Sequence, residues 1–288
     1  MISRLPAWFK QDLPDDSVLK NESLFSDFEM HTVCREAKCP NLSRCFKEQR
    51  FTFLILGNTC TRNCAFCGVN KAKEKLNLDQ SEPARIQEVV KKLGLDYVVI
   101  TSVTRDDLAD GGATYFAETI RLIHELPGNV EIEVLIPDLQ GRMESLEHIL
   151  AAKPQVLAHN LETIKRLYAD LRPEADYQLS LNLLNKAKGL SPGVVTKSSL
   201  ILGLGEREPE VTEAMRDLRV NHCDFLTLGQ YLAPSAEHYP VKEFITPQQF
   251  KRYENIALGL GFKAVLAGPL VRSSYQAKEI YRGHLCMI

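Results

Sequence analysis

Six of the eight cysteines stand in two triplets within residues 34–67, and this feature constrains the chain more than any other. The first triplet, with the spacing C-x4-C-x5-C, is Cys34, Cys39 and Cys45. The second, with the spacing C-x3-C-x2-C, is Cys60, Cys64 and Cys67. Loops this short let three thiolates converge on one soft metal centre, which favours zinc, Cu(I) or an iron–sulfur cluster. Each triplet lacks the fourth ligand of a closed structural site, so we expect an open coordination position.

A disulfide framework and a pair of structural zinc sites are the alternatives. Eight cysteines in 288 residues are few for a disulfide scaffold, and nothing at the start of the sequence indicates export. Zinc is disfavoured because Phe66, an aromatic residue, directly precedes the last cysteine of the C-x3-C-x2-C triplet, which is a highly specific pattern.

After residue 50, short β-rich runs alternate with amphipathic segments. The predicted strands are 51–56, 97–103, 130–136, 155–159, 196–203 and 224–229, with a shorter one at 263–267. The predicted helices are 83–94, 112–126, 141–152, 161–171, 174–189, 208–221 and 247–260. Such an alternation implies βαβ units and a parallel sheet. We therefore expect an α/β fold, a partial (β/α)6 barrel of the TIM type, with a doubly wound open sheet as the alternative. In both, chemistry belongs at the carboxyl ends of the strands.

The chain is expected to have three parts. Residues 1–50 have no regular pattern and predict an N-terminal extension that carries the first triplet and has little core of its own. Residues 51–260 form the barrel, and residues 261–288 form a short C-terminal extension. A net charge of −2 gives no reason to expect a nucleic acid or an anionic membrane as partner. Without an apolar run of transmembrane length, the protein is expected to be soluble and cytoplasmic.

The second triplet directly follows the first predicted strand, as expected of a barrel active site. After the next strand, Asp106 and Asp107 are expected to cap their loop rather than act as an acid and a base. His159, at a strand end, is expected to be a hydrogen-bonded packing residue. Cys223 is predicted to be a buried small hydrophobe, and Cys286 a thiol near the chain end without a role.

Longer motifs around these residues carry a family resemblance. GNTCTRNCAFCGV, around the second triplet, resembles the radical S-adenosylmethionine superfamily. Together with the first triplet, TLGQYLAPS at 227–235 and RSSY at 272–275 resemble the lipoyl synthase family over nearly the whole chain. The sequence departs from the family at Phe46, where Trp is more frequent, at Asn58, where Asp is usual, and at Ser199, where Gly is common. None of these is a proposed ligand.

The resemblance implies two [4Fe–4S] clusters and S-adenosylmethionine as cofactors. Cys60, Cys64 and Cys67 would hold the cluster that binds and cleaves S-adenosylmethionine. The first triplet would hold a second cluster, with Ser273 as its fourth ligand and Ser274 as the fallback. The expected contacts with S-adenosylmethionine are Phe66, Gly111, Gly112, Asn160 and Arg172.

The implied reaction inserts two sulfur atoms at C6 and C8 of an octanoyl group on a lysine of a lipoyl carrier domain. A 5′-deoxyadenosyl radical would abstract hydrogen, and the second cluster would supply sulfide, so Cys60, Cys64, Cys67 and Ser273 are the expected catalytic residues. The expected partners are an octanoylated glycine cleavage H protein or 2-oxoacid dehydrogenase E2 lipoyl domain, and an electron donor such as ferredoxin or flavodoxin. The alternatives are another sulfur-inserting radical enzyme, such as a methylthiotransferase or a biotin synthase relative, and a non-catalytic iron–sulfur or zinc protein.

Overall fold

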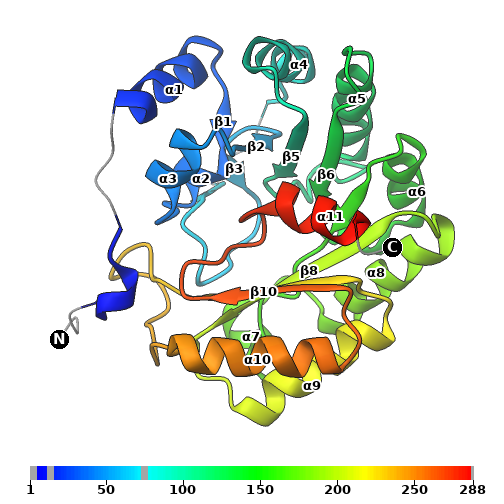
Figure 1. Cartoon of the computed structure of the whole chain (residues 1–288). Helices are drawn as coiled ribbons and strands as arrows, with labels where there is room; N and C mark the ends of the chain where they lie inside the picture. Colours follow the sequence, from blue (N-terminus) through cyan, green and yellow to red (C-terminus); the bar gives the residue numbers. More distant parts are fainter. Residues whose placement is uncertain (1–4, 12–15, 73–76, 287–288) are drawn as a thin grey trace.

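The structure, a computed structural model, describes residues 5–11, 16–72 and 77–286, and an eight-stranded sheet organises them (Figure 1). The strands, in their order across the sheet, are β1 (His31–Thr32), β2 (Thr52–Ile55), β5 (Tyr97–Ser102), β6 (Glu131–Leu135), β7 (Val156–Ala158), β8 (Val195–Leu202), β9 (Phe225–Gln230) and β10 (Ala264–Gly268). Strand β1 runs antiparallel to β2, and all the other neighbours are parallel. Two short strands, β3 (Thr59–Cys60) and β4 (Asn70–Lys71), form a separate parallel pair.

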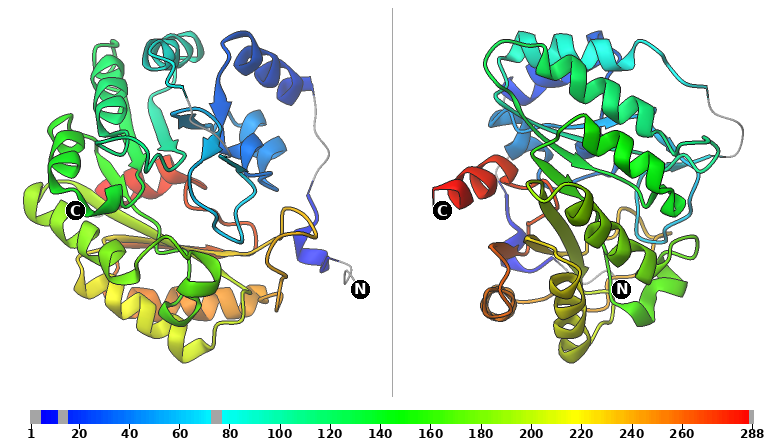
Figure 2. Two further views of the ribbon diagram at one scale, coloured as in Figure 1. Left: turned by 180° about the vertical axis from the view of Figure 1, so that it is seen from behind. Right: turned by 90° about the vertical axis from the view of Figure 1, so that its right-hand side faces the viewer.

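Helices cover the outer face of the curved sheet (Figures 1 and 2). They are α4 (Glu82–Leu93), α5 (Ala113–His124), α6 (Met143–Ala151), α8 (Tyr177–Leu190), α9 (Glu208–Val220) and α10 (Pro247–Gly259). Their starts follow local chemistry: the side chains of Asp176 and Thr246 accept hydrogen bonds from backbone N–H groups three residues on. The predicted α/β fold with a partial barrel is confirmed.

The helix predicted at 161–171 is wrong over residues 161–164. Only η3 (Lys165–Leu167) and α7 (Tyr168–Leu171) are helical. Glu162 instead forms a β-bridge with Leu200: its N–H donates to the carbonyl of Ser199 at 2.9 Å, and its carbonyl accepts from Ile201 at 2.8 Å. Because these backbone groups bond to strand β8, they are not free to start a helix.

The N-terminal 50 residues contain more regular structure than their sequence pattern indicates. They contain η1 (Ala7–Phe9), α1 (Asp16–Asp27), α2 (Val33–Glu36) and α3 (Leu42–Lys47), in addition to β1. Phe25 and Phe46 are fully buried, and their rings lie 4.8 and 5.1 Å from that of Phe51 at the start of the barrel. These residues belong to the same apolar cluster as the strand residue Phe53. The segment with the first triplet is thus packed onto the barrel through a shared core.

The C-terminal segment returns to the sheet. Strand β10 pairs with β9, and after residues 269–276 the chain forms α11 (Ala277–Leu285), which lies near β6 in Figure 1. Lys278 pairs with Asp96 at 2.6 Å, and Arg282 with Glu131 at 2.7 Å. These ion pairs fix the helix against the amino ends of β5 and β6. In the described part of the chain, no helix is both long and apolar enough to cross a membrane.

Candidate active site

A cavity of about 800 Å³ lies inside the open barrel, and both cysteine triplets line it. Strand residues such as Val99, Thr101 and Ile201 form part of its wall. A volume of this order is typical of sites for small molecules and cofactors. All eight cysteines are free, which removes the disulfide alternative.

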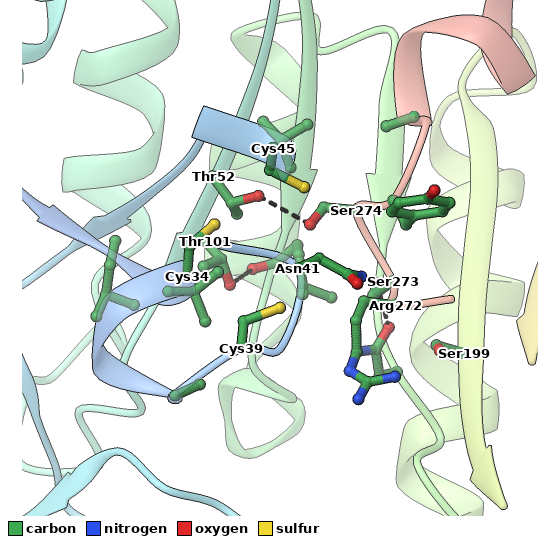
Figure 3. A pocket seen from close by; sticks show the side chains of 18 of the residues that line it. Cys34, Cys39, Asn41, Cys45, Thr52, Thr101, Ser199, Arg272, Ser273 and Ser274 are labelled. Atoms are coloured by element: carbon green, nitrogen blue, oxygen red, sulfur yellow. Dashed lines mark hydrogen bonds between the residues drawn. The ribbon is translucent and has the colours of Figure 1, made fainter. Parts of the chain in front are cut away.

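The first triplet lies at one side of this cavity. Cys34 is in α2, Cys45 is in α3, and Cys39 is in the turn between these two short helices. Figure 3 shows the three sulfur atoms on the same side, facing the segment that carries Ser273 and Ser274. The side chain of Asn41, in the same turn, donates to the carbonyl of Leu270 at 2.5 Å. This bond ties the cysteine-bearing turn to the C-terminal segment.

The RSSY motif closes the opposite side of this group (Figure 3). The hydroxyl of Ser274 accepts a hydrogen bond from Thr52 at 2.8 Å, and the hydroxyl of Ser273 donates to Asn160 Oδ1 at 2.9 Å. Asn160 in turn donates from Nδ2 to Glu162 at 2.9 Å. Both serines line the cavity with the first triplet, so the hydroxyl oxygens and the three thiols form a mixed hard and soft donor set.

Arg272 supplies positive charge beside these donors. Its guanidinium donates to the carbonyl of Val271 at 2.7 Å. Burial lowers the pKa of Arg272, and the neighbouring Cys39 opposes that effect. Gly229, on strand β9, lets this segment approach, because a Cβ there would meet the carbonyl oxygen of Val271 at 2.0 Å. The positive charge of a buried arginine would stabilise an anionic group in the cavity, and a thiolate-ligated iron–sulfur cluster is such a group.

In the second triplet, Cys60 is the last residue of β3, and Cys64 and Cys67 lie in the loop that joins β3 to β4. Thr61 N–H donates to Thr104 O at 3.0 Å, and Ala65 N–H donates to Leu171 O at 2.9 Å. The carbonyl of Cys67 receives a contact from His238 Nε2 at 3.2 Å. These bonds fasten the loop to the ends of three different segments, so the three cysteines are held in place before any metal binds.

The two cysteine-bearing loops meet at Gly68. A Cβ at this position would lie 3.0 Å from the ring of Pro234 and 3.3 Å from the carbonyl oxygen of Ala37. Ala37 belongs to the first triplet's turn, and Pro234 belongs to the 227–235 motif. The glycine next to Cys67 therefore allows three sequence-distant motifs to come into contact around one cavity.

Burial controls the protonation of the thiols. It raises the pKa of Cys34 and Cys45 to about 12 and that of Cys64 to about 11, and neighbouring thiolates add to the effect. It also raises the pKa of Cys67. These thiols are thus neutral at pH 7 unless a cationic centre displaces their protons, and metal binding should release protons.

The predicted contacts for S-adenosylmethionine are partly brought together. Phe66, Asn160 and Arg172 line the cavity with the second triplet. Arg172 Nη1 donates to the carbonyls of Asn160 and Leu161, at 3.2 and 3.1 Å, and to the hydroxyl of Tyr168, at 2.9 Å. Its Nε is buried without a hydrogen-bond partner among the described residues, which suits a polar ligand.

Gly111 and Gly112 lie elsewhere. They stand at the start of α5, against the side chains of Leu139 and Leu56, and are not among the residues that line the cavity. Their contact with S-adenosylmethionine stays a prediction. His159 is buried and its Nδ1 lies 2.9 Å from Ile136 O, as expected, but it also lines the cavity, and its Nε2 has no hydrogen-bond partner among the described residues. Cys223 is buried and Cys286 is exposed, both as expected.

Sequence reasoning missed three residues that shape the site. Gln230, fully buried, donates to the carbonyls of Leu202, Tyr231 and Glu243 and accepts from Ile245 N–H. It thereby holds the loop after β9 against the barrel. His238, whose Nδ1 lies 2.8 Å from Ser235 Oγ, connects that loop to Cys67. Both lie in or just after the 227–235 motif, which was the only signal in the sequence that could have pointed to them.

The third missed residue is Arg62, between Cys60 and Cys64. Asp106 was expected to cap its loop but is instead an ion-pair partner of Arg62 at 2.6 Å. Asp107, for which the same role was expected, pairs with Arg105 at 2.7 Å. The sequence pattern cannot distinguish these roles, because the cationic partner of Asp106 lies 44 residues away.

Comparison with known proteins agrees with this arrangement. The family model described as "Radical SAM superfamily" matches residues 54–218. The lipoyl synthase of Caldanaerobacter subterraneus subsp. tengcongensis is 51% identical over 277 residues, which cover 96% of this chain and 97% of the relative. The lipoyl synthase of Thermus thermophilus is 49% identical over 278 residues, covering 96% of this chain and 86% of the relative.

Solved structures of lower identity support the fold alone. The structure of HydG, a maturase of the [FeFe]-hydrogenase, has a TM-score of 0.60 at 16% identity and covers 80% of this chain and 54% of that one. The structure of methylornithine synthase (PylB) has a TM-score of 0.52 at 16% identity, with coverage of 94% and 95%. With two cysteine triplets around one barrel cavity and relatives about half identical over nearly its whole length, the chain belongs to the lipoyl synthase family of the radical SAM superfamily.

Proposed function

We propose that this chain inserts two sulfur atoms at C6 and C8 of an octanoyl group attached to a lysine of a lipoyl carrier domain. The observation that carries the proposal is that Cys34, Cys39 and Cys45 line the same cavity as Cys60, Cys64 and Cys67. A radical generated at one triplet could reach a substrate that also faces the other. A radical enzyme with a single cluster would have no use for the first triplet.

The residues divide into two groups by the cofactor that they would hold. Cys60, Cys64 and Cys67 would bind the [4Fe–4S] cluster that S-adenosylmethionine joins, with Phe66, Asn160 and Arg172 as contacts for the latter. Cys34, Cys39 and Cys45 would bind a second [4Fe–4S] cluster, with Ser273 as its oxygen ligand and Ser274 as the alternative. When bound, these groups supply the hydrogen-abstracting radical and the sulfur, which side-chain acids and bases cannot provide at an unactivated C–H bond.

The protein's own residues would position and shield the reaction. Val99, Thr101 and Ile201 present a largely apolar wall to the cavity, which suits a saturated acyl chain. Arg272 would offset the negative charge of the second cluster. The C-terminal segment, fixed by Asn41 and by the ion pairs of α11, would keep Ser273 beside the first triplet.

The macromolecular partners follow from the substrate. An octanoylated lipoyl domain presents its acyl group on a lysine side chain, which is long enough to enter a barrel cavity while the domain stays outside. We propose a glycine cleavage H protein or a 2-oxoacid dehydrogenase E2 domain as the carrier, and a ferredoxin or flavodoxin as the electron donor.

Separate cysteine variants test the division of labour. Cys64→Ala should abolish formation of 5′-deoxyadenosine, because it removes a ligand of the cluster that S-adenosylmethionine would join. Cys39→Ala should keep that reaction but lose sulfur insertion into an octanoyl-lysyl peptide. Mass spectrometry of the peptide measures this loss. Loss of both reactions to the same extent in both variants would contradict the proposal. A chain that forms lipoyl product with Cys39 replaced would favour another sulfur source.

A further inference from the structure

Arg62 is a buried arginine in the loop that carries the second triplet. It lies between Cys60 and Cys64, and only 5% of its surface is exposed. Its Nε and Nη2 donate to the carboxylate of Asp106 at 2.6 and 2.9 Å. Its Nη1 and Nη2 donate to the carboxylate of Asp138 at 2.6 and 2.7 Å. The guanidinium is therefore bidentate to two carboxylates at once.

Both carboxylates belong to residues that follow strands of the barrel. Asp106 follows strand β5, and its backbone N–H donates to Thr61 Oγ1 at 3.1 Å. Asp138 follows strand β6, is almost fully buried, and caps η2 (Leu139–Gly141) by accepting from Gln140 N–H at 3.0 Å. Two rigid strand ends thus present acceptors whose separation matches the planar fork of an arginine.

The same residue also touches a predicted cluster ligand. The backbone N–H of Arg62 points at Cys60 Sγ, with an N-to-S distance of 3.4 Å. The direction of this N–H depends on the loop conformation, and the buried side chain of Arg62 restrains that conformation. A lysine could keep the positive charge, but it could not engage both carboxylates in a bidentate manner.

We propose that Arg62 is a positioning residue, which clamps the loop of Cys60, Cys64 and Cys67 to the carboxyl ends of β5 and β6 and keeps its own N–H on the Cys60 sulfur. The inference rests on the proposed function, in which this loop holds the cluster that S-adenosylmethionine joins. It predicts that the clamp governs how firmly iron is retained at this triplet and not at the other.

Iron retention in two full-length backgrounds tests the clamp. The Cys39→Ala chain should keep about four irons at the second triplet, and the Cys64→Ala chain about four at the first. Arg62→Lys should weaken iron retention in a chelator titration about 10–100-fold in the Cys39→Ala background and leave it unchanged in the Cys64→Ala background. The reduced cluster in Arg62→Lys should also give a broader electron paramagnetic resonance signal, which reports a less uniform ligand geometry.

Further variants separate the clamp from general stability. Asp138→Asn should act as Arg62→Lys does, and the double variant should lose no more iron than either single one. Asp106→Asn should give a smaller loss of iron, because the Asp106 side chain is 26% exposed, and circular dichroism should show that the fold is intact. Arg121→Lys is the matched control, since Arg121 forms an exposed ion pair with Glu118 on α5, and it should change nothing.

Three results would overturn the inference. Unchanged iron retention in Arg62→Lys and Asp106→Asn, with both backgrounds holding about four irons, would refute the clamp and leave the proposed function intact. Equal loss of iron in both backgrounds would reduce Arg62 to a general stability residue. Failure of the Cys39→Ala chain to hold iron at all would overturn the assignment of two clusters, and the inference with it.

Discussion

Replacing Phe46 by alanine should uncouple the first triplet from the rest of the protein. Phe46 is fully buried directly beside Cys45 in α3, and its ring centroid lies 5.1 Å from that of Phe51 and 5.7 Å from that of Phe25. Truncating a buried phenylalanine typically costs about 3–5 kcal/mol. We therefore expect the free energy of unfolding to fall by about 4 kcal/mol.

This change in the free energy of unfolding corresponds to a lower melting temperature. With an unfolding entropy of about 2.1 cal/mol/K per residue, a chain of 288 residues unfolds with about 0.6 kcal/mol/K. The melting temperature of the metal-free protein should therefore drop by about 7 °C, measured by circular dichroism under anaerobic conditions. After reconstitution, the iron content should fall from about eight per chain toward four, because α3 no longer holds Cys45 in place.

Phe250→Ala is the matched control. Phe250 is 1% exposed in α10 and belongs to the second apolar cluster, which does not include the first triplet. It should lower the melting temperature by a similar amount and leave the iron content near eight. A melting temperature of Phe46→Ala within about 2 °C of the parent, or equal iron loss in the two variants, would refute the reasoning.

Three further predictions follow from single contacts. Ser273→Ala should lower the iron content at the first triplet, whereas Ser274→Ala, which loses a hydrogen bond from Thr52, should not; the reverse result would move the ligand role to Ser274. Asn41→Leu removes the bond to Leu270 O and should cost about 1–3 kcal/mol, with faster proteolysis within residues 269–276; unchanged proteolysis would show that other contacts fix that segment. Burial alone would raise the pKa of Asp224, but the ion pairs of this residue with Lys188 and Lys263 outweigh burial and lower the pKa. The ionised carboxylate therefore stabilises the fold above the ordinary carboxyl pKa of about 3.9, and this stabilisation is lost as the pH falls through the lowered pKa. The melting temperatures of the parent and of Asp224→Asn, measured without metal, should differ at pH 7 and converge on acidification, and a constant difference would contradict this.

The sequence predicted the barrel well because its strands and helices alternate with clear periodicity. Each predicted strand has a counterpart shifted by at most one or two residues, from β2 at Thr52–Ile55 to β10 at Ala264–Gly268. The failures have local causes. A two-residue strand such as β1 has no periodicity to detect, and the helix expected from residue 161 was lost because Glu162 bonds to β8.

The site was predictable where chemistry depends on spacing, and hidden where it depends on the fold. The two triplets could be identified because only a few residues separate their members. The contact of Gly68 with Pro234, in contrast, joins residues that most of the barrel sequence separates. The partnership of Arg62 with Asp138 joins residues 76 apart. Such contacts are set by which strand ends are neighbours in the sheet, and only the folded arrangement of β5 and β6 brings them together.

The most direct test of the account is mass spectrometry of an octanoyl-lysyl peptide incubated with the anaerobically reconstituted chain, S-adenosylmethionine and a reductant, alongside the iron and sulfide content of the protein. If both triplets hold clusters and the proposed reaction occurs, the protein should contain about eight irons per chain and the peptide should gain two sulfur atoms. About four irons, with S-adenosylmethionine consumed and no sulfur gained, would contradict the role of the first triplet; zinc in place of iron would contradict the account as a whole.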